Sequence, residues 1–392
     1  MSYKADFRRF LDANPGRVHF AAHSHHFWPD VSFDAHSQAW LDAAAMADRK
    51  WDKIFGEIVP RAQKGVARML GLPDPSTITF APNVHDLLMR IVSCLRRPSP
   101  GKPLRVLSTD AEFHSFARQA ARFEEDGEMA VTRVSAEPFA TFTERFVAAA
   151  AAGTWDLVYV SHVFFSSGYA VPDLARIVAA VPSKDTFVVV DGYHAFAAMP
   201  VDLSPIASRA FYVAGGYKYA MSGEGCCFVH APPGYGTRPR DTGWFAAFGA
   251  LEGESAADRV PYAPDGARFM GATFDATSLY RLDAVLAWLE RVGLTPAKIH
   301  AHAHEMQAVF LREIAKGPLP LDASQLVVPM AETSRGQFLT FRTPRAAELH
   351  AKLLAANVVT DVRGDRLRFG FGVYHDEEDV IAGAARVRAA LG

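Results

Sequence analysis

Short β-rich runs alternate with helical patterns between residues 75 and 230, and this alternation limits the folds open to the chain more than any other feature. Runs rich in Val, Ile, Tyr and Phe occur at 76–81, 105–110, 156–163, 186–191, 210–216 and 226–231. Helical patterns lie between several of them, at 85–97, 115–125 and 173–181. Strands that alternate with helices favour a mostly parallel sheet covered by helices on both faces. The sequence therefore predicts an α/β fold for this part of the chain.

The pattern changes after about residue 265. Residues 274–293 place four leucines at helical spacing, and shorter helix and strand patterns follow at 337–372. We therefore predict three parts. They are an N-terminal segment that packs on both domains (1–60), a large domain (61–270) and a smaller α+β domain (271–392).

Composition and charge argue against several classes of function. The net charge is −2, which gives no sign of a surface for nucleic acid or for an acidic membrane. No stretch is apolar enough to cross a bilayer, and residues 1–16 lack the apolar core of a signal peptide. The three cysteines are Cys94 and the adjacent Cys226 and Cys227, which point to opposite faces of a strand and so are not expected to form a bridge. We expect a cytoplasmic protein.

The apolar run at 188–190 ends in Asp191, and a buried carboxylate is costly unless a cation meets it. Lys218 follows a later strand pattern, in the segment GGYKYAMSGEG. Ligands of open α/β sheets gather at the carboxyl ends of strands, where a desolvated lysine forms Schiff bases. Pyridoxal phosphate would explain both residues, since its ring nitrogen needs a carboxylate partner. A turn aspartate before Gly192 and a surface lysine are the alternatives.

Three further residues carry weaker signals. His194, three residues after Asp191, is either a cofactor contact or a structural histidine. Phe113 begins a helical run after a strand, so its ring either stacks on a pyridine ring or belongs to the core. Asn83 lies where a strand gives way to a helix. It is a good N-cap, and a helix N-terminus also binds phosphate through backbone N–H groups.

These residues resemble the aminotransferase class V enzymes of pyridoxal-phosphate fold type I, and most of all the kynureninases. The D-x-x-H element at 191–194 and the G/S-Y-K-Y element at 216–219 carry the resemblance. Further similar segments cover most of the chain, namely WDKIFGEIVPRAQKGVARMLGL, EFHS, GWF, FMGATFD and DVRGDRLRFGFGVYHDEEDV. The resemblance implies a large domain with a mostly parallel seven-stranded sheet, a smaller α+β domain, pyridoxal phosphate as cofactor, an amino-acid substrate and a homodimer.

The resemblance also implies a role for each matching residue. Lys218 would hold the cofactor covalently and then move protons, Asp191 would pair with the ring nitrogen, and Phe113 would stack on the ring. The residues implied at the phosphate and its surroundings are Asn83, Val84 (through its N–H), His194 and Tyr217. Those implied to act across a dimer interface are Trp244 and Thr273. Arg368 would bind the substrate carboxylate, because a guanidinium fork matches two oxygens, and Arg366 on the same strand face is the alternative.

Two segments depart from the kynureninase pattern. AHSHHFWPD at 22–30 replaces a G-N-S-L-G-like element, and GVYHD at 372–376 replaces a P-L-Y-N-like element. Both regions would meet the substrate's side chain, so the identity of the substrate stays open. Ser24 together with His25 or His23 is predicted to point into the substrate mouth, and a plain structural role is the alternative. His23 and His25 would share a strand face, but no cysteine lies nearby to complete a metal site, and we predict no metal.

The leading hypothesis is a kynureninase-type hydrolase, in which water attacks a side-chain carbonyl, the Cβ–Cγ bond breaks and alanine is released. A class V aminotransferase or another pyridoxal-phosphate lyase would need the same residues. A cysteine desulfurase needs a reactive cysteine well after the lysine, and no cysteine follows Cys227. A non-catalytic protein of this fold would have no need of a desolvated lysine. No G-x-G-x-x-G opens the first strand–helix unit, which disfavours a nicotinamide-dependent dehydrogenase.

Overall fold

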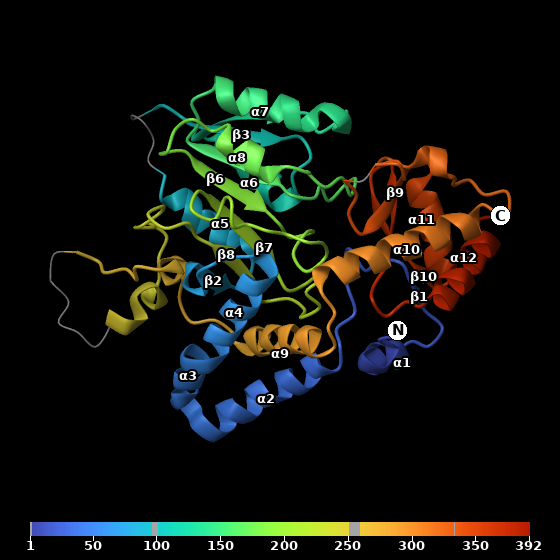
Figure 1. Cartoon of the computed structure of the whole chain (residues 1–392), viewed down its shortest axis with the longest axis horizontal. Helices are drawn as coiled ribbons and strands as arrows, with labels where there is room; N and C mark the ends of the chain where they lie inside the picture. The colour runs from blue at the N-terminus through green and yellow to red at the C-terminus, as the bar shows by residue number, and fades with distance from the viewer. Residues whose placement is uncertain (1, 96–100, 251–258, 333) are drawn as a thin grey trace.

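A computed structural model of the chain describes residues 2–95, 101–250, 259–332 and 334–392 (Figure 1). Seven strands form the central sheet, in the order β2-β8-β7-β6-β5-β3-β4. They are β2 (Ile78–Ala81), β3 (Leu104–Thr109), β4 (Met129–Val134), β5 (Leu157–Ser161), β6 (Phe187–Asp191), β7 (Ala210–Gly215) and β8 (Cys227–His230). The neighbouring strands β7, β6, β5, β3 and β4 run parallel to one another. Strand β8 runs antiparallel to β7 and to β2. The mostly parallel sheet is confirmed.

Strand β4 was not expected from the sequence. It is an edge strand, and only Met129 of its six residues is buried. An edge strand with one solvated face lacks the apolar run that marks the central strands. The other six strands lie where the β-rich runs predict them.

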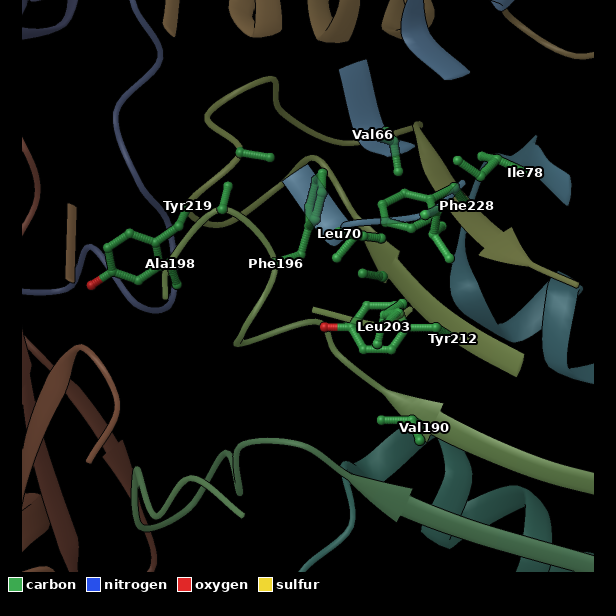
Figure 2. Close-up of a cluster of buried hydrophobic side chains, with 14 of the residues drawn as sticks. Val66, Leu70, Ile78, Val190, Phe196, Ala198, Leu203, Tyr212, Tyr219 and Phe228 are labelled. Atoms are coloured by element: carbon green, nitrogen blue, oxygen red, sulfur yellow. The ribbon is translucent and has the colours of Figure 1, made fainter. Parts of the chain in front are cut away.

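Helices cover both faces of the sheet. One face packs against α4 (Val59–Leu70), α7 (Phe142–Ala152), α8 (Leu174–Ala179) and α9 (Thr277–Arg291), and the other against α5 (Val84–Ser93) and α6 (His114–Glu125). Val190 and Tyr212 belong to the same buried cluster as Val66 of α4, and Figure 2 shows these side chains within it. Since side chains alternate along a strand, Asp191 faces the side of α5 and α6.

Helix α9 belongs to the core of the large domain. Leu279, Leu282 and Leu286 are buried there, and α9 packs along α2 (Val31–Met46) and α4. The change from one hydrophobic core to the other comes after α9, so the packing favours a domain boundary beyond Arg291. The division into domains stays a prediction.

The small domain has its own hydrophobic core between three helices and a three-stranded antiparallel sheet of order β11-β12-β9. Its elements are α10 (Pro296–Ile314), β9 (Phe338–Arg342), α11 (Ala346–Ala355), β10 (Val358–Val359), β11 (Asp361–Arg363), β12 (Arg366–Gly370) and α12 (Glu377–Leu391). The N-terminal strand β1 (Val18–His19) pairs with β10, on the same side of the molecule in Figure 1. Phe20 packs in this core, whereas Phe7 and Phe27 pack in that of the large domain.

The remaining elements are short. They are η1 (Lys4–Phe7), α1 (Arg8–Asp12), η2 (Ala47–Arg49), α3 (Lys50–Lys53), the π-helical η3 (Ile54–Ile58), η4 (Pro75–Thr77), η5 (Phe139–Thr141), η6 (Trp244–Ala250), η7 (Gly266–Phe269) and η8 (Ala323–Gln325). The helix expected at 85–97 ends at Ser93, and its last two residues lie outside the described ones. Within the described ranges, no helix has the length and apolar character needed to span a bilayer.

Candidate active site

A cavity of about 560 Å³ lies at the carboxyl ends of the central strands. Its walls come from the starts of α5 and α6, the ends of β5 and β6, and the segments after β6 and β7. Seven residues singled out from the sequence line it together, namely Asn83, Val84, Phe113, Asp191, His194, Tyr217 and Lys218. The volume lies within the range of sites for small ligands.

Lys218 follows β7 and places its amine in a desolvated part of the cavity. Nζ donates a hydrogen bond to the backbone oxygen of His23 at 3.2 Å and lies 5.8 Å from the ring centre of Tyr193. Burial and the nearby Arg368 guanidinium lower the pKa of Lys218 to about 7, although Asp361 and Asp191 act in the opposite direction. A substantial share of the amine is therefore neutral near pH 7, and a neutral amine is the nucleophilic form.

Asp191 ends β6, and its side chain is held from two sides. Oδ2 accepts a hydrogen bond from the Tyr159 hydroxyl at 2.8 Å, and Oδ1 accepts one from the Tyr193 backbone N–H at 2.9 Å. Burial raises the pKa of Asp191, which these hydrogen bonds and the Lys218 charge oppose. A carboxylate has about four lone-pair positions, so this side chain can still accept a proton donor from the cavity that it lines.

Glu112 is a second buried carboxyl group next to the site, and sequence reasoning missed it. Oε2 accepts from the Ser161 hydroxyl at 2.5 Å, and Oε1 accepts from the Thr109 hydroxyl at 2.7 Å. Burial, with the charge of Asp191 acting in the same direction, raises the pKa of Glu112 to about 7, although the hydrogen bonds from Ser161 and Thr109 oppose the shift. Ser161 pairs with Asp191 in the sheet, so Glu112 fixes the strand end beside that carboxylate. The available signal was an acidic residue directly before Phe113 at the start of a helix.

The start of α5 forms part of the cavity wall. Asn83 caps the helix, since its side-chain oxygen accepts from the Asp86 backbone N–H at 2.8 Å. The first N–H groups of a helix have no partner within the helix, and those of Val84 and His85 belong to residues that line the cavity. Among the described residues, His194 Nδ1 is buried without a hydrogen-bond partner. A helix N-terminus and a free imidazole nitrogen together suit an anionic group.

Five of the residues assigned a role from the sequence do not line this cavity, namely Ser24, His25, Trp244, Thr273 and Arg368. Trp244 and Thr273 are exposed on the single chain, Trp244 by 44%. Arg368 is buried on β12, where it forms an ion pair with Asp361, its partner across the sheet, and donates to the Phe165 backbone oxygen. Arg366 pairs instead with Glu137 at 3.0 Å. The role of Arg368 toward a substrate carboxylate stays a prediction.

The predicted strand face shared by His23 and His25 is wrong. Both Ser24 and His25 donate their backbone N–H to the Ala21 oxygen at 2.9 Å, so the chain turns here. His23 is buried and stacks on Phe338, with ring centres 4.4 Å apart. His25 Nδ1 lies 3.2 Å from the Tyr217 hydroxyl. Across the described ranges, no cluster of three potential metal ligands occurs.

The model of the family described as aminotransferase class V matches residues 34–382. The chain belongs to this family. Its enzymes use pyridoxal phosphate, which is therefore the cofactor of this chain.

The chain is also similar to a kynureninase from Deinococcus radiodurans, with 30% identity over 224 residues. The match spans 56% of this chain and 53% of that protein, so it covers about half of the relative.

Two solved structures share the fold. A cysteine desulfurase from Thermococcus onnurineus NA1 gives a TM-score of 0.80 at 16% identity, covering 98% of this chain and 97% of that one. The cystine C–S lyase C-DES, in complex with cysteine persulfide, gives 0.79 at 18% identity, covering 96% and 98%. Identities this low support the fold alone. They confirm fold type I, in which a second domain accompanies the seven-stranded sheet.

Proposed function

We propose that this chain hydrolyses the Cβ–Cγ bond of an α-amino acid with a side-chain carbonyl group and releases alanine. The observation that carries the proposal is one cavity joining the Lys218 amine to the Asp191 carboxylate. The partial similarity to a kynureninase supports this reaction among those of the family.

The residues of the cavity fit the aldehyde, the ring nitrogen and the phosphate of pyridoxal phosphate. Lys218 offers an amine with a pKa of about 7 for the aldehyde, and Asp191 offers a buried carboxylate for the ring nitrogen. The residues assigned to the phosphate and its surroundings are Asn83, Val84, His194 and Tyr217, which include the start of α5 and the unpaired His194 nitrogen. Phe113 stands at the start of α6 as the partner of the ring face.

Pyridoxal phosphate, when bound, supplies an electron-accepting ring for charge that develops on the substrate's Cα. Lys218 takes the proton from Cα and returns one later, which its low pKa permits near neutral pH. Asp191 keeps the ring nitrogen protonated through its negative charge. Tyr159 and the Tyr193 backbone hold that carboxylate in one orientation.

A homodimer would place the exposed residues Trp244 and Thr273 at the active site of the partner subunit. Trp244 and Phe248 are exposed beside a cluster of aromatic rings that includes Phe55 and Phe245. Exposed apolar groups of this size mark interfaces. We assign Trp244 and Thr273 to the cofactor phosphate of the partner subunit. Sedimentation should therefore give twice the chain mass of 42.8 kDa, and a monomer that turns over would remove this assignment.

Sulfur chemistry is the activity named for the structural neighbours, a cysteine desulfurase and a C–S lyase. A desulfurase requires a cysteine that takes up the substrate's sulfur, and the sequence has none after Cys227. Both Cys226 and Cys227 are buried, and burial raises the pKa of each thiol, which leaves little reactive thiolate. We therefore place carbon–carbon cleavage ahead of desulfuration.

The deciding experiment mixes the purified holoenzyme with a panel of amino acids that includes kynurenine and 3-hydroxykynurenine, without any keto acid. Mass spectrometry should find alanine together with the acid derived from the side chain. Amino-group transfer that appears only after a keto acid is added would instead identify an aminotransferase.

A cytoplasmic location stays a prediction.

A further inference from the structure

A second cavity, of about 420 Å³, lies between the N-terminal segment and the small domain. Its walls include Phe10, Arg17, Ser24 and His25 from the first part of the chain. Residues 359–363 of the small domain form the other side.

The wall of this cavity continues, along the chain, from the backbone that meets the Lys218 amine. Lys218 donates to the backbone oxygen of His23, and the next two residues, Ser24 and His25, line the second cavity. His25 is hydrogen-bonded to the hydroxyl of Tyr217, which lines the first cavity. The His25–Tyr217 pair therefore forms the partition between the two cavities.

Flat aromatic surfaces form one wall of the second cavity. The rings of Phe10 and Phe27 stack with centres 5.1 Å apart, and the His19 ring also stacks on Phe27 with centres 4.3 Å apart. Burial lowers the pKa of His19 and of His25, so both imidazoles are neutral near pH 7. Stacked and offset rings are favourable neighbours for another planar ring.

The charge of the wall comes from arginines. Arg17 lies over the Phe27 ring at 4.8 Å and donates through Nη2 to the Phe10 backbone oxygen at 3.1 Å. In the part of the chain that the structure describes, Arg17 has no carboxylate within 4.0 Å. The one carboxylate of the cavity, Asp361, is shared by Arg363 at 3.1 Å and by Arg368. The lining residues therefore carry an excess of positive charge. Arg17 is the lining arginine that forms no ion pair among the described residues.

We infer that this cavity receives the side chain of the substrate, and that it selects a planar ring carrying a negative group, which Arg17 binds. This inference rests on the proposed function, because it takes the Lys218 cavity as the place of the substrate's amine. It names the substrate class that the altered segment at 22–30 leaves open. The pairing is one of charge-assisted hydrogen bonds from a guanidinium to an anionic oxygen, which are stronger than those to a neutral acceptor.

The test compares two amino acids of the same shape, para-carboxy-L-phenylalanine and para-carbamoyl-L-phenylalanine. Neither has a carbonyl group at Cγ, so neither can undergo the proposed cleavage, and their binding is independent of it. Calorimetry with the holoenzyme should give a dissociation constant at least about tenfold lower for the carboxylate compound. The Arg17→Gln variant should bind the two compounds about equally, whereas Arg17→Lys should keep part of the preference.

Arg8→Gln is the matched control, because Arg8 is an exposed arginine of the same segment and does not line the cavity. It should keep the wild-type preference. Equal binding of both compounds by the wild type, or a preference that survives in Arg17→Gln, would overturn the inference. Either result leaves the release of alanine from other substrates as a separate question, so failure here and failure of the proposed cleavage are distinguishable.

Discussion

Replacing Lys218 with alanine is expected to abolish turnover and the visible absorption of the covalently held cofactor. The side chain supplies both the amine that binds the aldehyde and the group that moves the proton at Cα. Loss of a positioned proton-transfer group alone lowers rates by about 10²–10⁴-fold, and loss of the covalent link adds to this. Turnover assays and absorption spectra of the reconstituted variant measure the two effects.

Lys64→Ala is the control for this variant, since Lys64 is exposed on α4 and lies outside the cavity. A Lys218→Ala protein that keeps both turnover and absorption would show that another amine holds the cofactor.

Thermal unfolding separates a loss of chemistry from a loss of folded structure in this variant. The folded apoprotein holds the pKa of Lys218 at about 7, against an ordinary value of 10.5. The unfolded chain therefore binds more protons between these values, and the wild-type apoprotein gains stability as the pH rises through this range. The variant should lack this gain.

The parts of the site that follow strand ends were predictable, because buried parallel strands appear in a sequence as continuous apolar runs. The apolar runs before Asp191 and before Lys218 are continuous, and parallel strands bring their carboxyl ends to one edge of the sheet. Asn83 likewise stands where a strand passes into a helix, and it caps that helix. Local pattern and overall topology agree at each of these residues.

Partners chosen by tertiary packing were not predictable in the same way. Glu112 gains its importance from Ser161, which is close only because β3 and β5 are neighbours in the sheet. Arg368 and Asp361 face each other because of the register between β11 and β12, and nothing in either strand's sequence fixes that register. The turn at 21–25 likewise depends on tertiary packing, which its own sequence does not specify. His23 lies against Gly370, where a Cβ atom would overlap the imidazole ring.

Tyr159 is a partner that the sequence could have revealed. It sits in the apolar strand β5, and a buried tyrosine hydroxyl nearly always has a hydrogen-bond partner. A strand-end carboxylate two positions further along the neighbouring strand is within reach, since Tyr159 pairs with Val189. The alternation of side chains then places the hydroxyl and Asp191 on the same face of the sheet.

Replacing Asp191 with asparagine is expected to lower turnover while the cofactor stays attached. Asparagine has nearly the same shape, and its side-chain oxygen can still accept from the Tyr193 backbone N–H. It carries no negative charge, so the ring nitrogen loses the partner that keeps it protonated. Loss of one preorganised electrostatic partner in an active site costs on the order of 10²–10³-fold in turnover. The visible absorption should persist, because Lys218 is unchanged.

The matched control is Tyr159→Phe, which removes the hydrogen bond to Oδ2 and leaves the charge of Asp191 in place. Removing this bond raises the pKa of Asp191, since the bond favours the ionised form. The expected loss of turnover is therefore smaller than for the asparagine variant and becomes greater as the pH falls. Pyridoxal-phosphate binding, read by absorbance, and turnover as a function of pH give the comparison. If both variants lose turnover equally at every pH, the carboxylate is required for its position in the hydrogen-bond network rather than for its charge.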